Sequence, residues 1–364
     1  MKNYIAGLCF IACAGITTAQ NRTFTTEIDL EATEVISQGN TGTCWSFSTS
    51  SFLESEIKRI TRKSIDISEM YNVRHTYPKK SWIYVMRQGK AQFSQGGLAH
   101  DVINSISEHG FVPNSVYTGL QSNETGHNHS NLVQTIKPIL DQKIKEKISD
   151  WKTPVDSILD SKLGKDITTF MYDGKPYTPK EFMASLNINP KNYVSLTSFT
   201  HQPYNSNFVL NIPDNFSNGS YYNIPLDQLV KTTNHALKNG YTIALDCDVS
   251  EVTFSSKHGI AVVLEDKKEK DVTKLLKEKN ITADYRQQEF ENYNTTDDHL
   301  MHIVGLVKDQ NGTTYYKVKN SWGKGSKRIG NDGFIYMSEA FFKLKTVSVL
   351  LHKNAVHKTV ISNF

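Results

Sequence analysis

The sequence predicts an α+β fold with two lobes, a mainly helical lobe followed by a lobe rich in antiparallel strands. In the first half of the chain, apolar residues recur at helical spacing, as at Leu53, Ile57 and Ile60. In the second half, residues 241–249 form an apolar run after an Asn-Gly pair, and residues 315–319 alternate in polarity, as strands do. Helices followed by strands are typical of α+β chains.

The N-terminus has the pattern of an export leader. Residues 1–19 contain one lysine, an apolar run and Thr-Thr-Ala before Gln20. The run is too short to span a membrane. Lipidation at Cys13 is the weaker alternative, because Phe-Ile-Ala-Cys is a poor lipidation motif. We therefore expect a signal peptide at 1–19 and a single domain at 20–364 that is exported to the periplasm or the medium.

Composition excludes several classes of protein. A formal net charge of +4 over 364 residues argues against a dedicated nucleic-acid binder. No other stretch approaches 18 uninterrupted apolar residues, so we expect no membrane span. Beyond the leader only Cys44 and Cys247 remain, which is too few for a disulfide scaffold. A bridge between these two cysteines would leave neither thiol free to react.

A glycine-rich loop leads to Cys44 in the segment Gln-Gly-Asn-Thr-Gly-Thr-Cys-Trp-Ser-Phe-Ser, which begins at Gln38. The helical spacing that follows places Cys44 at or just inside a helix N-terminus. There the helix dipole and free N–H groups favour a thiolate, which is the nucleophilic form of cysteine. The alternative is a small buried cysteine with no chemical role.

Further motifs flank this segment. Gly96-Gly97 permits a close backbone approach or simply forms a loop before a helix at about 98–109. Residues 115–190 are polar at first and then contain an amphipathic helix. His127 and His129 lack neighbouring acidic or cysteine ligands, so we predict no metal there.

Two later motifs contain histidine and asparagine. Asp-Asp-His299-Leu-Met-His302-Ile-Val-Gly begins a strand, and Asn320-Ser-Trp322-Gly follows the next strand. Taken alone, a histidine entering an apolar strand can be a core residue, and Asn-Ser-Trp-Gly can be a turn. A metal pair of His299 and His302 would lack a third ligand of known spacing, and we predict neither a metal nor a cofactor.

Together these motifs resemble the active-site segments of papain-like cysteine peptidases. Cys44, His302 and Asn320 occur in the chain order of that family's Cys-His-Asn set. The resemblance implies that His302 takes the Cys44 proton and that Asn320 orients the imidazole. We prefer His302 over His299 because it directly precedes Ile-Val-Gly, as the family's histidine precedes an apolar strand. The resemblance also implies that Gln38 donates to the oxyanion together with the Cys44 N–H.

The same resemblance gives roles to three other residues. Trp322 would cover the hydrogen bond between the histidine and Asn320, and Gly96 and Gly97 would pair with the backbone of an extended substrate. Within the family, the chain is similar to the bleomycin hydrolase and aminopeptidase C branch, through the Lys-Asn-Gly and Cys-Asp-Val of residues 238–249. By this resemblance Cys247 is structural.

The resemblance covers most of residues 35–353 and is weakest across 115–190. It implies a mainly helical lobe at about 35–192, a β-rich lobe at about 193–353 and a C-terminal tail at 354–364. Members of the branch can form hexamers, so a homo-oligomer is one expectation. Members also place a terminal carboxylate in the cleft, but here only twelve residues follow the last expected strand, 346–352.

The resulting hypothesis is an exported thiol peptidase that cleaves peptides through a covalent acyl-enzyme, an aminopeptidase in preference to an endopeptidase. Two other classes stay open. One is a different Cys-His acyl-transfer enzyme, and the other is a non-catalytic binding module, against which the intact set of Gln38, Cys44, His302 and Asn320 argues.

Overall fold

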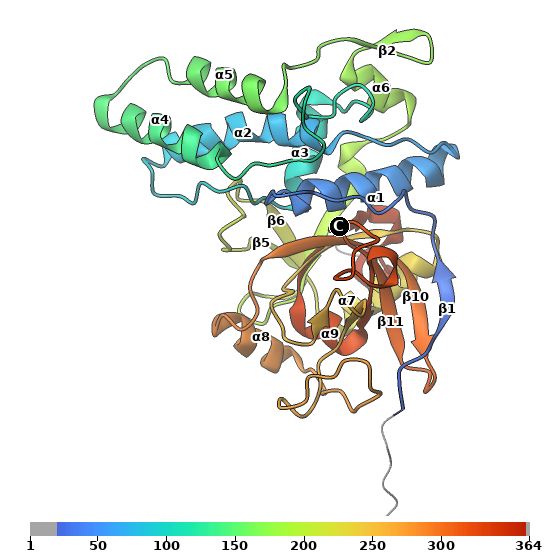
Figure 1. The fold of residues 1–364 in the computed structure, drawn as a ribbon. Helices are drawn as coiled ribbons and strands as arrows, with labels where there is room; N and C mark the ends of the chain where they lie inside the picture. Colours follow the sequence, from blue (N-terminus) through green and yellow to red (C-terminus); the bar gives the residue numbers. More distant parts are fainter. Residues whose placement is uncertain (1–19, 362–364) are drawn as a thin grey trace, which may run out of the picture.

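The computed structural model describes residues 20–361 and divides them into a helical layer and a large sheet, as Figure 1 shows. Residues 1–19, on which the signal-peptide prediction rests, and residues 362–364 lie outside the described part. The helices from α1 to α6 gather above the sheet, whereas α7, α8 and α9 lie among the strands of the lower lobe. The helices are α1 (Cys44–Thr61), α2 (Glu69–Met86), α3 (Ala99–His109), α4 (Leu132–Glu146), α5 (Lys152–Leu163), α6 (Pro179–Ser185), α7 (Leu226–Lys238), α8 (Ala283–Glu291), α9 (Glu339–Lys345) and α10 (Lys358–Ile361).

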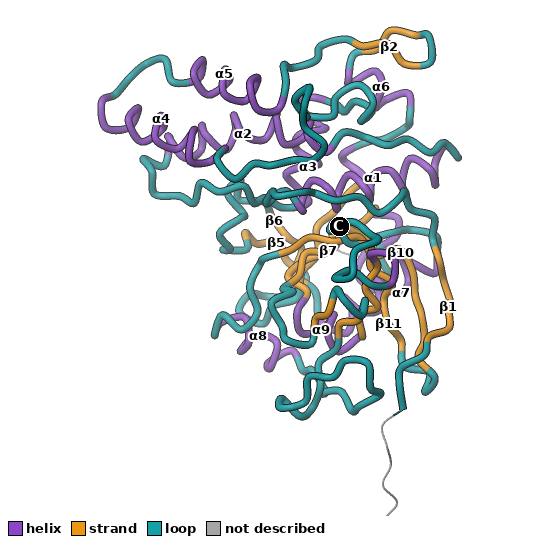
Figure 2. The backbone as a smooth tube through the Cα atoms, viewed as in Figure 1, coloured by secondary structure: helices purple, strands orange, loops and turns teal. Residues whose placement is uncertain are grey.

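The strands form one large mixed sheet and one small hairpin, and the loops between them are long in both lobes (Figure 2). The large sheet runs β5-β6-β4-β13-β7-β10-β11-β12-β9-β8, with β1 also paired to β10, and the hairpin is β2-β3. The strands are β1 (Phe24–Asp29), β2 (Phe170–Tyr172), β3 (Lys175–Tyr177), β4 (Tyr193–Thr197), β5 (Ser206–Val209), β6 (Ser220–Asn223), β7 (Ile243–Cys247), β8 (Phe254–Ser255), β9 (Ile260–Ala261), β10 (His299–Asp309), β11 (Thr314–Lys319), β12 (Phe334–Ser338) and β13 (Thr346–His352).

Strand β10 is the centre of the large sheet because it pairs with three other strands. Its first half lies antiparallel to β7, its second half antiparallel to β1, and β11 runs along much of its length. A side chain at Gly305 would collide with the backbone carbonyl of Ile28 in β1, so glycine is required for this close approach. The pairing with β11 contains a bulge between Ile303 and Gly305.

Helix α1 lies between the two lobes, with α2 and α3 on one side and β7 and β10 on the other. Small serines on this helix let the backbones approach and satisfy carbonyl groups of its neighbours. Ser46 donates to the Glu69 carbonyl (2.7 Å) and Ser48 to the Met301 carbonyl (2.5 Å). The helix is therefore fixed from both sides, and its first turn is held against the start of β10.

Two large apolar cores support this arrangement, one among the upper helices and one within the lower lobe. The end of the described chain belongs to the lower core, because Ala355, Val356 and Val360 are buried in it. No helix among residues 20–361 is both long enough and apolar enough to cross a bilayer. The predicted α+β fold with a helical upper lobe and a β-rich lower lobe is confirmed.

Candidate active site

The loop before α1 places Cys44 as the first residue of the helix, where the sequence predicted it. Gln95 holds this loop, since its side-chain oxygen accepts from the Gly42 N–H (2.8 Å) and its carbonyl accepts from the Trp45 indole (3.0 Å). The first N–H groups of a helix have no acceptor within the helix, so the Cys44 N–H is available to a ligand. Cys44 and Cys247 are both free thiols.

The Cys44 thiol lies against the start of β10. Burial raises its pKa to about 12, and an N–H group of Leu300 that donates to the sulfur opposes this shift. Carboxylates of Asp297, Asp214 and Asp246 raise the pKa further. The thiolate expected from the helix terminus is therefore not the resting state, because loss of hydration outweighs the helix dipole.

His299 forms the hydrogen bond that the sequence analysis assigned to His302. Its Nε2 lies 2.8 Å from Asn320 Oδ1, and the same oxygen accepts from the Ser321 N–H at 2.7 Å. Because a backbone N–H can only donate, this second bond fixes which end of the amide is the oxygen. His299 must then carry its proton on Nε2, which leaves Nδ1 as a base. Burial lowers the pKa of His299 to about 4, so the ring is neutral.

The choice of His302 as the partner of Asn320 was wrong. His302 Nδ1 lies 2.9 Å from Ser51 Oγ, and Ser51 also accepts from Lys319 (2.8 Å). His302 stands opposite Lys319 in the β10–β11 ladder, so the two side chains share one face of the sheet. Asn320, one residue on, takes the other face, which it shares with His299. Burial and the neighbouring Lys319 ammonium hold the pKa of His302 well below its usual range.

Trp322 and Gln38 both lie close to the pair formed by His299 and Asn320. The Trp322 ring packs on His299 with 4.8 Å between ring centroids and 34° between planes. The Gln38 side chain is oriented at both ends, accepting from Ser321 Oγ (2.6 Å) and donating to the Thr41 carbonyl (2.7 Å). Its second amide hydrogen remains for a ligand.

The Gly96-Gly97 pair packs closely against two side chains. A Cβ at Gly96 would overlap the carboxylate of Asp214, and a Cβ at Gly97 would press on the Trp45 ring at 3.1 Å. The Gly96 carbonyl accepts from the buried ammonium of Lys80, which also donates to the Ser94 carbonyl (2.9 Å). Glycine is required at positions 96 and 97 because neighbouring side chains approach the backbone closely, and not because the backbone is left-handed there.

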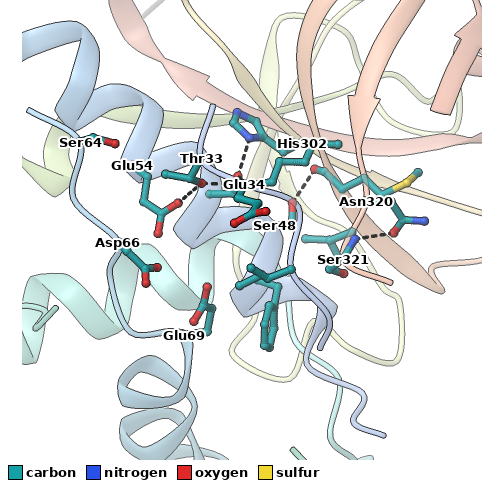
Figure 3. Close-up of a pocket in the computed structure, with 16 residues that line it drawn as sticks. Thr33, Glu34, Ser48, Glu54, Ser64, Asp66, Glu69, His302, Asn320 and Ser321 are labelled. Carbon is teal, nitrogen blue, oxygen red and sulfur yellow. Dashed lines mark hydrogen bonds between the residues drawn. The ribbon is translucent and has the colours of Figure 1, made fainter. Parts of the chain in front are cut away.

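His302 belongs instead to a polar cavity of about 290 Å³, which Ser48, Ser51 and Glu54 of α1 also line (Figure 3). Asn320 borders this cavity, but neither Cys44 nor His299 lines it. Glu54, Asp66 and Glu69 lie within 4.8 Å of one another there. Burial raises the pKa of Glu54 to about 7 and that of Glu69 well above its usual value. Lys319 provides the positive charge of this network, linked to Glu54 through Thr33.

Asp214, Asp246 and Asp297 act on the ionisation of the thiol, and none of the three was predicted as a site residue. A local indication existed for Asp246, because it is a charged residue inside the otherwise apolar run of β7, where charge is costly unless it is used. Asp297 could have been noted as part of the Asp-Asp pair before His299. Nothing in the polar loop around Asp214 indicates its position.

Two protein-family models match this chain, one over each half. Residues 22–157 match the model of the papain family cysteine proteases, which defines the class as a cysteine peptidase. Residues 164–364, more than half of the chain, match the peptidase C1-like family, and the chain belongs to that family. The predicted resemblance to the bleomycin hydrolase and aminopeptidase C branch is confirmed.

Individual relatives agree with this assignment. Aminopeptidase C of Listeria innocua is 28% identical over 194 residues, a match that covers 51% of this chain and 42% of the relative. The matched part is thus less than half of that relative. Aminopeptidase G of Lactobacillus delbrueckii subsp. lactis is 24% identical and matches 93% of this chain and 84% of its own length. The crystal structure of PepW from Lactobacillus rhamnosis HN001 has the same fold, with a TM-score of 0.72, 19% identity and coverage of 93% and 84% of the two chains.

Proposed function

We propose that this chain is a cysteine aminopeptidase that cleaves peptides through an acyl-enzyme on Cys44. The observation that carries this proposal is the bond from His299 to an Asn320 amide that Ser321 holds in one orientation. This bond leaves Nδ1 of His299 as the base, and the next residue in the chain, Leu300, donates its backbone N–H to the Cys44 sulfur. The names of the relatives, aminopeptidase C and aminopeptidase G, support the exopeptidase assignment.

The reaction begins with a neutral thiol and a neutral imidazole, since burial favours both. The Cys44 proton moves to His299 Nδ1 as the sulfur attacks the substrate carbonyl, forming the C–S bond and an oxyanion. When the oxyanion collapses, the C–N bond breaks and Nδ1–H protonates the leaving amine. Water then loses a proton to Nδ1 and attacks the thioester, and the proton returns to the sulfur as the acid leaves.

The oxyanion would be held by the Cys44 N–H and by the free amide hydrogen of Gln38. The bonds of Gln38 to Ser321 and Thr41 fix this donor before the substrate arrives, so no reorganisation is needed during the reaction. Trp322 shields the bond between His299 and Asn320 from water, which strengthens it.

Mass spectrometry of the intact protein, mixed rapidly with an aminoacyl ester, tests the covalent step. The wild type should show one acyl adduct that decays with turnover, and Cys44→Ala should show none. Cys247→Ala is the matched control and should keep the adduct, because that thiol is fully buried. An adduct that persists in Cys44→Ala, or turnover of peptides by that variant, would contradict the proposal.

We also propose that the chain is exported and that the mature protein begins near Gln20. Support comes from the residues that follow, which are integral to the fold: Arg22 is buried and donates to the Val272 carbonyl (3.1 Å), and the Gln20 carbonyl accepts from the Leu275 N–H (2.8 Å). N-terminal mass spectrometry of active protein from the native cell tests this. An intact Met1 would refute it.

A further inference from the structure

Three carboxylates gather beside the nucleophile, and neither the fold nor the triad requires them. Asp246 lies in β7 directly opposite Leu300, the residue whose backbone N–H donates to the Cys44 sulfur. Asp297 lies two residues before His299, and its carboxyl group is within hydrogen-bond reach of Asp246. Asp214 comes from a loop between β5 and β6 and lies against Gly96. All three are near enough to Cys44 to act on its ionisation.

The two inner carboxyl groups lack the donors that buried carboxylates normally have. Asp246 is only 2% exposed, and its Oδ2 accepts from Ser348 Oγ at 3.2 Å. Apart from the contact between the two acids, neither Asp246 Oδ1 nor Asp297 Oδ2 receives a hydrogen bond from any residue between 20 and 361. Two buried acids in contact cannot both stay ionised without a cation, so in the free protein they share a proton.

Asp214, unlike the two inner acids, is oriented by hydrogen bonds from neighbouring side chains. Its Oδ1 accepts from Gln92 (3.1 Å) and from Ser94 (3.2 Å), which turns Oδ2 toward the Gly96 backbone. Lys80 lies close by, but both of its hydrogen bonds go to backbone carbonyls, and no ion pair joins it to Asp214. The Asp214 carboxylate is therefore oriented and remains able to accept from a ligand.

An aminopeptidase must hold a free α-ammonium group at a set distance from its nucleophile. In a substrate cut after its first residue, that nitrogen lies two bonds, about 2.5 Å, from the attacked carbon. The carbon approaches the sulfur to about 3–3.5 Å, and a hydrogen bond adds about 2.8 Å. A carboxylate that binds the ammonium must therefore lie within about 9 Å of Cys44 Sγ, which limits the search to its immediate surroundings.

We propose that Asp246 and Asp297, assisted by Asp214, bind the α-ammonium group of the substrate and so restrict cleavage to the first residue. An ammonium brings three N–H donors, which match the unpaired buried oxygens of Asp246 and Asp297 and the Oδ2 of Asp214. Its charge displaces the shared proton and offsets the repulsion between the carboxylates. The proposal rests on the proposed peptidase function and names the group that makes it an exopeptidase.

The test compares paired fluorogenic substrates, leucine aminomethylcoumarin with a free amine and the same compound acetylated at nitrogen. The wild type should cleave the free-amine substrate far better. Asp246→Asn and Asp297→Asn should each lower kcat/KM on the free-amine substrate by about 10- to 100-fold, the range for losing a charged hydrogen bond. Their activity on the acetylated substrate should be unchanged or higher.

Asp298→Asn is the matched control, because Asp298 is adjacent in sequence but its carboxylate accepts from the Val249 N–H (2.9 Å). It should behave as the wild type. Deletion of residues 362–364, which keeps the buried Val360, tests the terminal carboxylate as a rival ligand and should leave the preference intact. Loss of the preference on that deletion would overturn the proposal.

Two further experiments distinguish an α-ammonium ligand from a lysine side chain, and failure of this proposal from failure of the proposed peptidase function. Losses confined to N-blocked peptides that carry lysine would assign the cluster to a side-chain ammonium and overturn our assignment. Equal losses on both leucine substrates would also overturn it while leaving the peptidase function intact. Calorimetry with leucinamide needs no turnover: it should bind the wild type at least tenfold more tightly than Asp246→Asn, and equal affinities would refute the proposal even if the protein cleaves nothing.

Discussion

Replacing Asp246 with asparagine should make the protein more stable at alkaline pH, although the residue lies beside the nucleophile. Burial raises the pKa of Asp246 from 3.8 to about 7, so the folded state holds this proton more tightly than the unfolded chain. An aspartate of this kind stabilises the fold at low pH, and the contribution is lost as the pH rises from about 4 to about 7. Three pKa units correspond to an upper limit of about 4 kcal/mol.

Asparagine has no charge to bury, and it retains an oxygen for Ser348 and gains an N–H for the open Asp297 oxygen. Urea unfolding measured at intervals from pH 4 to pH 8 provides the assay. The free energy of unfolding of Asp246→Asn, relative to wild type, should rise across this range by up to about 4 kcal/mol. Asp246→Ala should show the same pH dependence at a lower overall stability. Parallel curves for wild type and Asp246→Asn would refute the reasoning.

Three other predictions concern the cleft. Gln38→Ala should lower kcat by about 10²–10³, the usual effect of removing one oxyanion donor, with little change in KM; an unchanged kcat in steady-state assays would exclude Gln38 from that role. Gly96→Ala should reduce activity on free-amine substrates, because the added methyl overlaps the Asp214 carboxylate, and a fully active variant with an unaltered fold would show that this contact is unimportant. Iodoacetamide should alkylate Cys44 and leave Cys247 intact in the native protein, since Cys247 has no exposed surface, and peptide mapping that finds equal labelling would contradict the assignment of the nucleophile.

The fold class could be predicted from local patterns, and so could three of the four positions that we propose for catalysis. Cys44 lies at the start of a helix because the glycine-rich loop cannot continue the helical spacing that follows it. Asn320 and Gln38 come from motifs in which both neighbours and spacing are informative. These features depend on short stretches of chain, so they remain visible without knowledge of the rest of the fold.

The choice between His299 and His302 could not be made locally. The two residues are three apart in a strand, so their side chains point to opposite faces. Which face meets Asn320 depends on the register of β10 with β11, where His302 stands opposite Lys319. That register is set by pairing between distant segments and by the bulge near Gly305. The fact that His302 directly precedes Ile-Val-Gly gives no information about this register.

The three carboxylates beside the thiol could not be predicted from local patterns for the same reason. Asp246 lies in β7, whereas Asp214 and Asp297 lie in two loops, and the three segments are far apart in sequence. Only the assembled lower lobe brings them to the thiol. The depressed pKa expected for Cys44 was likewise a local inference, drawn from the helix terminus. Burial and the three carboxylates, which are properties of the whole cleft, reverse its sign.

The most direct test of the account is the comparison of His299→Gln with His302→Gln on one free-amine fluorogenic substrate. Both changes replace a buried imidazole with a polar side chain, and thermal unfolding would show whether each variant is folded. We expect His299→Gln to lose at least about 10³-fold in kcat/KM, as when a general base is removed, and His302→Gln to stay within about tenfold of the wild type. An active His299→Gln beside an inactive, folded His302→Gln would contradict it.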